Sequence, residues 1–146
     1  MPRNYTVTTK ILKPVGDVYA AIVDRQQMSR YFTDRSSQDL EAGDRVTWIW
    51  DAWGEFPVTV KTMETNRLIE LTLDSKDWQK TTTDAYEVLV TFEFEETDEG
   101  DTLLSISESG WRTDAEGLKG SHDNCSGWTH MAMCLKGFVE HGLDLR

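Results

Sequence analysis

One carboxylate could do chemistry inside the folded chain. Glu108 follows Leu104 and Ile106 at a spacing of two residues, so in a β-strand all three side chains share one face. On a buried face, desolvation raises the pKa of a carboxyl group, which could then orient a ligand or act as an acid or a base. Near the open end of the strand, the same group would be solvated. Glu108 is therefore only a weak catalytic candidate, and both positions are open.

Two histidines and two cysteines lie close together near the C-terminus: His122, Cys125, His130 and Cys134. On an α-helix they form two neighbouring pairs, but Cys125 and His130 point about 140° apart. Four ligands must converge to hold zinc, so we predict no metal site. A Cys–His nucleophile pair on this face would lack a site for an oxyanion. The sequence has no phosphate-binding or dinucleotide-binding glycine motif, and we predict no cofactor.

Aromatic residues are abundant, with 6 Trp, 4 Tyr and 5 Phe among 146 residues. They either fill a core or line a flat-walled pocket. A buried indole N–H needs a partner, and a polar ligand or a water molecule in a pocket supplies one. The candidate ligand-binding residues are Trp48, Trp50, Phe56, Tyr86, Phe92, Glu108, Trp111, Asn124, Trp128 and Met131.

The residues that must position these side chains alternate between apolar and polar. A first strand rich in threonine and β-branched residues is expected at 5–13. Five further runs with two-residue periodicity follow, at 46–51, 56–62, 69–74, 86–95 and 102–108. Short turns separate most of these runs. The pattern predicts an antiparallel sheet with one buried side.

Three segments have helical periodicity instead. Residues 15–23 carry an apolar stripe, and Asp24 can cap a second short helix at 25–31. Residues 118–141 predict one long amphipathic helix that ends at Gly142. Its apolar stripe needs a partner, and the concave sheet is the one available.

These elements together predict an α+β domain with a helix-grip fold. A curved antiparallel sheet of about six strands wraps around the long C-terminal helix, and two short helices after the first strand close one end. A single domain is expected to span residues 1–146. An aromatic-lined cavity between the sheet and the long helix is the predicted binding site.

Charge and composition exclude several classes of partner. The net charge of −11 disfavours nucleic acid and anionic membrane surfaces. No apolar run is long enough to insert into a membrane, and the N-terminus has no signal region. Cys125 and Cys134 would lie about 13 Å apart on one helix, too far for a disulfide. We therefore expect a cytoplasmic protein.

Several short motifs resemble those of the SRPBCC superfamily, which is also described as START-like or birch-pollen-allergen-like. Within it, the chain most resembles the domain homologous to the activator of heat-shock protein 90 ATPase. The motifs that carry the resemblance are Asp17-Val18-Tyr19, Tyr31-Phe32, Gly43-Asp44-Arg45-Val46, the run from Ile106 to Trp111, Gly127-Trp128, Leu135-Lys136 and Glu140-His141-Gly142.

The resemblance implies a helix-grip fold and leaves the function open, because one fold hosts many functions. Relatives bind lipids, sterols or polyketides, act as cyclases or dehydratases, or dock on chaperones. Our first hypothesis is a non-catalytic binder of a small hydrophobic or aromatic molecule. The second is a protein-interaction module that acts like a co-chaperone. The third is a cyclase- or dehydratase-type enzyme that uses Glu108 or Tyr86.

Overall fold

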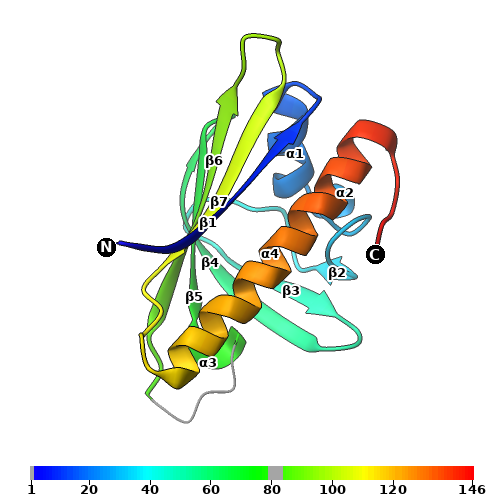
Figure 1. Ribbon diagram of the computed structural model, residues 1–146. Coiled ribbons are helices and arrows are strands. Elements are labelled where there is room, and N and C mark those ends of the chain that lie inside the picture. Colours follow the sequence, from blue (N-terminus) through cyan, green and yellow to red (C-terminus); the bar gives the residue numbers. More distant parts are fainter. Residues whose placement is uncertain (1, 79–83) are drawn as a thin grey trace.

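Seven antiparallel strands form one sheet in the computed structural model, which describes residues 2–78 and 84–146 (Figure 1). The order across the sheet is β1-β7-β6-β5-β4-β3-β2. The strands are β1 (Arg3–Ile11), β2 (Arg35–Ser36), β3 (Arg45–Trp50), β4 (Gly54–Glu64), β5 (Leu68–Asp74), β6 (Glu87–Glu96) and β7 (Thr102–Ser109).

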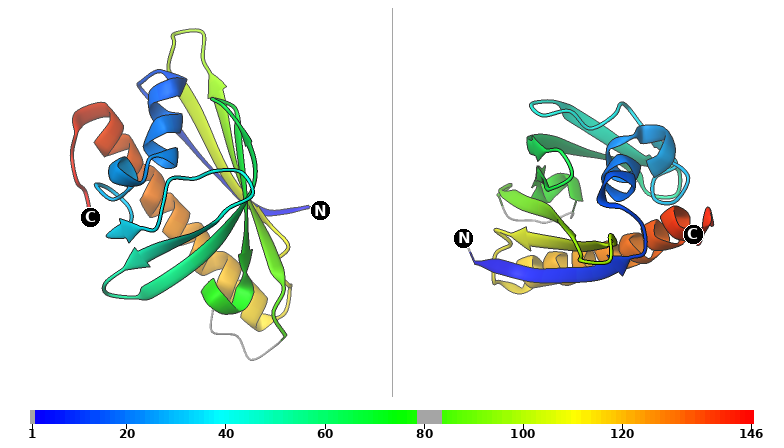
Figure 2. Two further views of the ribbon diagram at one scale, coloured as in Figure 1. Left: turned by 180° about the vertical axis from the view of Figure 1, so that it is seen from behind. Right: turned by 90° about the horizontal axis from the view of Figure 1, so that it is seen from above.

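Four helices accompany the sheet in the described part of the chain. They are α1 (Val15–Val23), α2 (Arg25–Met28), α3 (Ser75–Trp78) and α4 (Ala115–His141). The long helix α4 crosses the concave face of the sheet, as Figures 1 and 2 show. Helices α1 and α2 lie beside the end of α4, whereas α3 lies near its beginning. This arrangement confirms the predicted α+β helix-grip fold.

The described residues form seven strands, whereas about six were predicted. The additional strand, β2, has two residues and pairs with β3 at the edge of the sheet. Two residues are too few to show an alternating pattern, so periodicity alone could not detect it. The four-residue helix α3 was missed for the same reason.

The long helix begins and ends at residues that satisfy its free backbone groups. The Asp114 side chain accepts a hydrogen bond from the Gly117 amide at 2.8 Å, so α4 begins three residues before the predicted start at 118. Gly142 ends the helix in the left-handed conformation, with φ of 68°, as predicted. Both cysteines lie on α4 and are free. None of the helices in residues 2–78 and 84–146 is long and apolar enough to cross a membrane.

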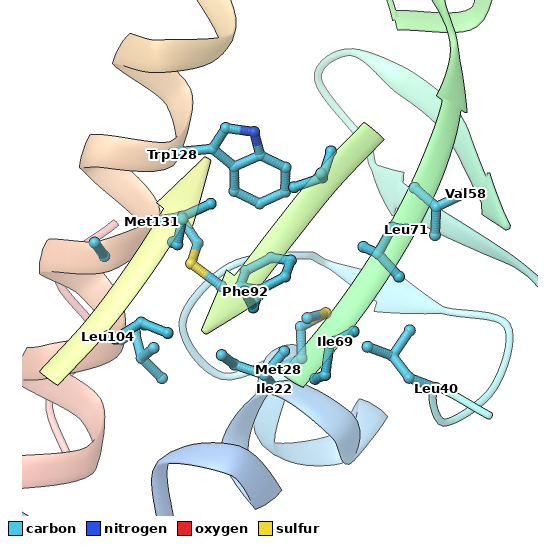
Figure 3. Packing of buried hydrophobic residues seen from close by; sticks show 14 of the residues in the cluster. Ile22, Met28, Leu40, Val58, Ile69, Leu71, Phe92, Leu104, Trp128 and Met131 are labelled. Atoms are coloured by element: carbon cyan, nitrogen blue, oxygen red, sulfur yellow. The ribbon is translucent and has the colours of Figure 1, made fainter. Parts of the chain in front are cut away.

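The core lies between the sheet and α4. Figure 3 shows Trp128 and Met131 of α4 beside Phe92 of β6, with Leu104 and Ile69 from neighbouring strands further along the same layer. Phe92 and Met131 are fully buried and Trp128 is 2% exposed. The apolar stripe of α4 thus packs on the inner face of the sheet, which is the contact that its periodicity predicted.

Candidate functional site

The predicted binding residues form two adjoining groups that share Trp128. The first, called here the aromatic cluster, joins residues of the inner sheet face to α4. It consists of Phe32, Trp48, Trp50, Phe56, Trp78, Phe92 and Trp128. The second, called here the Glu108 site, consists of Tyr5, Glu108, Trp111, Asn124 and Trp128. Met131 lies in the core beside Trp128 (Figure 3), and Tyr86 contacts Trp111 edge to face with ring centroids 6.2 Å apart.

Glu108 points inward and is fully buried, so of its two possible positions the inward one is correct. Its Oε1 accepts a hydrogen bond from the Trp111 indole at 2.7 Å. Its Oε2 accepts two more, from the Trp128 indole at 2.8 Å and from the Asn124 amide at 3.0 Å. Side-chain donors from β7's C-terminal flank and from α4 therefore surround the carboxylate, which joins the helix to the sheet.

Burial dominates the electrostatics of the Glu108 site. Desolvation raises the pKa of Glu108 above its ordinary value, while Tyr5, Trp128, Trp111 and Asn124 limit the rise. Tyr5 stands directly opposite Glu108 in the β1–β7 ladder. Its own pKa is raised by burial first, and then by the negative charge of Glu108. Both groups therefore hold their protons more firmly than they would in water.

Backbone geometry places Trp111 over the carboxylate. Gly110, with φ of 105°, turns the chain after β7 in a conformation that other residues rarely adopt. The Asn4 side chain then accepts a hydrogen bond from the Trp111 amide at 3.1 Å. Gly120 on α4 lies directly beneath the indole, where a Cβ atom would come within 2.6 Å of the ring. The site therefore depends on close contact between Trp111 and a glycine of the long helix.

The aromatic cluster is held together by edge-to-face and stacked ring contacts. Trp48 contacts Trp128 at 6.2 Å between ring centroids and with an interplanar angle of 76°. Trp50 contacts Phe56 at 5.4 Å. Its indole N–H donates to the Phe32 carbonyl oxygen at 2.7 Å. Such ring pairs add stability beyond the apolar area that they bury.

The rings of the aromatic cluster fill much of the space where the sequence predicted an open cavity. Trp48 and Phe92 are fully buried, and Trp128 nearly so. Two surface hollows lie elsewhere: one on the outer face of α4, between His122 and Met133, and one between α1 and the end of α4. A guest molecule at the aromatic cluster would therefore have to replace a side chain of the protein.

Trp78 and Phe32 belong to the aromatic cluster, although sequence reasoning did not select them for it. Trp78 ends α3 and stacks on Trp128, with centroids 6.2 Å apart and ring planes at 27°. Its indole N–H donates to the Pro57 carbonyl oxygen at 3.0 Å. A tryptophan within the charged run Ser75-Lys76-Asp77-Trp78 was the available signal, because such a residue needs an apolar contact.

The histidines and cysteines of α4 lie in the described part of the chain. Cys134 Sγ and His130 Nε2 are 3.5 Å apart, as expected for neighbours one turn apart. Among residues 2–78 and 84–146, no three histidine, cysteine or acidic side chains group in a way that could hold a metal ion. Burial raises the pKa of the Cys134 thiol, which disfavours a nucleophilic thiolate.

Comparisons with known proteins agree with this fold. A model of the family described as "Activator of Hsp90 ATPase homolog 1-like protein" matches residues 13–140. The fold is similar to that of the Aha1 dimer from Colwellia psychrerythraea, with a TM-score of 0.78 and 17% identity over 97% of this chain and 98% of that one. Protein SSP2350 from Staphylococcus saprophyticus has a TM-score of 0.76 and 23% identity over 97% and 94% of the two chains. No curated protein matches the sequence.

Proposed function

This chain belongs to the family of Activator of Hsp90 ATPase homolog 1-like proteins, and on that premise we propose that it binds a small, flat, apolar molecule without transforming it. The binding site is the aromatic cluster, and the guest takes the position of the Trp78 indole. This assignment rests on the way in which Trp78 occupies the cluster.

Trp78 has the contacts that a bound aromatic ligand would have. One face of its indole stacks on Trp128, and its ring lies 5.3 Å from that of Phe56 and 6.0 Å from that of Trp48. One hydrogen bond, to the Pro57 carbonyl oxygen, fixes its edge. The remaining walls come from the sheet and α4, so they persist when this side chain moves.

The attachment of Trp78 to the rest of the protein is weak compared with that of its neighbours. The side chain is only partly buried, whereas Trp48 and Trp128 are at most 2% exposed. It is carried by the four-residue helix α3, which is too short to be stable by itself. The free energy needed to displace the Trp78 indole is subtracted from the free energy of ligand binding. The affinity for the ligand is therefore higher when this displacement is easier.

Non-catalytic binding is favoured because the buried carboxylate of Glu108 is already occupied. Both oxygens of Glu108 accept hydrogen bonds from protein donors. A general acid or base must reach the proton that it transfers. The hydrogen bonds to Glu108 instead direct both of its oxygens toward protein side chains. Glu108 therefore fits the role of an anchor for Trp128 and Trp111 better than that of a catalytic group.

Ligand binding can be tested by removing the side chain that competes with the guest. Indane is a flat hydrocarbon about as large as indole. We expect the Trp78→Ala variant to bind it at least about tenfold more tightly than the parent chain does. Proton NMR of the indole N–H groups gives both the affinity and the location. The resonances of Trp48, Trp50 and Trp128 should shift on titration.

A matched control is available at another tryptophan. Trp53 is 75% exposed at the turn between β3 and β4, outside the aromatic cluster. Trp53→Ala should therefore leave indane binding unchanged. If folded Trp78→Ala protein shows no indane-dependent shift of any indole resonance, the proposal is wrong.

A second candidate function, protein interaction, is favoured by the same exposed Trp53. Tryptophan is enriched among the residues that contribute most of the binding energy in protein interfaces, and this one is accessible to a partner. The candidate partner is an Hsp90-type ATPase, as the family description suggests. We expect Trp53→Ala to abolish any stimulation of such an ATPase, while Trp78→Ala retains it. Equal stimulation by parent and Trp53→Ala chains would exclude this surface.

A further inference from the structure

The indole N–H of Trp48 is buried without an acceptor among the residues that the structure describes. The side chain is fully buried on β3, and the rings of Phe32, Trp50, Trp78 and Trp128 surround it. The other indoles are satisfied: those of Trp50, Trp78, Trp111 and Trp128 donate to protein oxygens, and that of Trp53 is largely in water.

An unpaired donor in this position is unfavourable, and the protein offers little to relieve it. A buried N–H group that loses its hydrogen bond to water costs free energy unless another acceptor replaces the water. A trapped water molecule would itself need two or more polar partners, whereas several of the groups packed against Trp48 are aromatic rings. A ring face is at best a weak acceptor for an N–H group.

The ring that carries the unpaired donor lies next to the position that a guest would take. The ring centroids of Trp48 and Trp78 are 6.0 Å apart, with planes at 79°. A molecule that replaces the Trp78 indole would thus lie against Trp48. The indole of Trp78 cannot satisfy Trp48, because an indole nitrogen is only a donor and this one already donates to Pro57.

We infer, on the basis of the proposed function, that the ligand is a neutral planar aromatic molecule with a carbonyl oxygen, which accepts the hydrogen bond from Trp48. A carboxylate fits poorly, because Glu108 already places a buried acidic group beside Trp128 and the chain carries a net charge of −11. A plain hydrocarbon leaves the donor unpaired. The Trp48 indole therefore selects among flat molecules for those with an acceptor at the edge.

The test compares two probes that differ in one carbonyl group. Indanone and indane have the same fused rings, but only indanone has an acceptor. We expect the Trp78→Ala chain to bind indanone about tenfold more tightly than indane, which corresponds to a difference in binding free energy of about 1.4 kcal/mol. Both probes should shift the N–H resonance of Trp48, but only indanone, which accepts a hydrogen bond from it, should move it downfield. This NMR measurement needs no change at Trp48.

Substitutions in the Trp78→Ala background then identify the donor. Trp48→Phe removes the unpaired N–H and should abolish the preference for indanone. The matched control is Trp53→Phe, because Trp53 is 75% exposed outside the aromatic cluster and its substitution should leave the preference intact. Equal affinities for both probes, with no indanone-specific shift at Trp48, would overturn the inference and leave the proposed function standing. If neither probe binds, both are wrong.

Discussion

Trp128 and Glu108 are joined by a hydrogen bond of 2.8 Å between two almost fully buried side chains. The bond orients the Trp128 indole, which stacks on Trp78 and contacts Phe92 in a T-shaped arrangement. The aromatic cluster is therefore built on a tryptophan whose orientation is set by a carboxylate outside the cluster. The two groups of residues are coupled at this single indole.

The first prediction concerns this hydrogen bond. Trp128→Phe keeps an aromatic ring but removes a donor from a buried carboxylate, so we expect it to lower the free energy of unfolding by about 2–4 kcal/mol. Trp78→Phe, by comparison, removes a hydrogen bond from a partly buried indole to a neutral carbonyl, and should cost about 1 kcal/mol. Urea denaturation measures both. Equal losses in the two variants would contradict the role given to Glu108.

The second prediction concerns Glu108 itself. Glu108→Gln has nearly the same shape, but one carboxylate oxygen becomes an amide NH2 that cannot accept hydrogen bonds. At least one of the donors Trp111, Trp128 and Asn124 then loses its acceptor, which should lower the free energy of unfolding by about 1–3 kcal/mol at neutral pH. Denaturation by urea at pH 7 measures the loss. A variant as stable as the parent would show that the hydrogen bonds contribute nothing net.

The pH dependence of stability gives a third prediction at the same residue. Burial raises the pKa of Glu108 above its ordinary 4.5, so the folded state binds more protons than the unfolded state just above that pH. The contribution of this group is full below pH 4.5 and is lost as pH rises through the raised pKa. As pH rises through this window, the free energy of unfolding of the parent should therefore fall relative to that of Glu108→Gln. A pH-independent difference would contradict the raised pKa.

The fourth prediction tests the contact between Trp111 and α4. An alanine Cβ at Gly120 would come within 2.6 Å of the Trp111 ring, so Gly120→Ala must displace the indole and weaken its bond to Glu108. We expect a loss of about 1–3 kcal/mol, measured by thermal or urea unfolding. Gly127, also within α4, has open space around it. Gly127→Ala should instead raise stability by up to about 1 kcal/mol, and equal effects at both glycines would refute the packing argument.

Local pattern sufficed to predict the frame of the fold. The alternation through Leu104, Ile106 and Glu108 placed the carboxylate on the correct strand face, because successive strand residues point to opposite sides. Helix periodicity likewise placed Asn124 and Trp128 on the buried side of α4. Those features depend on residues close together in sequence, and the short elements β2 and α3 were missed because they contain too few residues to show a period.

The partners within the site could not be predicted, because they depend on contacts between distant segments. Tyr5 meets Glu108 through the pairing of the first and last strands, more than a hundred residues apart. Trp78 is surrounded in sequence by polar residues and gains its apolar environment from rings distant in sequence, among them Trp128 and Phe56. Periodicity also cannot distinguish a ring that lines an empty pocket from one that fills it, since both positions require an apolar residue on the same face.

The last prediction concerns the tyrosines. Burial raises the pKa of Tyr5 and Tyr31 well above the ordinary 10.0, and the charge of Glu108 raises that of Tyr5 further. Neither hydroxyl should ionise in the native protein when pH reaches 10.0, and the phenolate absorbance of the folded chain should fall short of that of the unfolded chain. Because the folded state retains these protons, stability should fall as pH rises above 10.0. Tyr5→Phe should leave the native titration curve unchanged at that pH and reduce the loss of stability above it. Native ionisation of Tyr5 at its ordinary pKa would show that water reaches the Glu108 site.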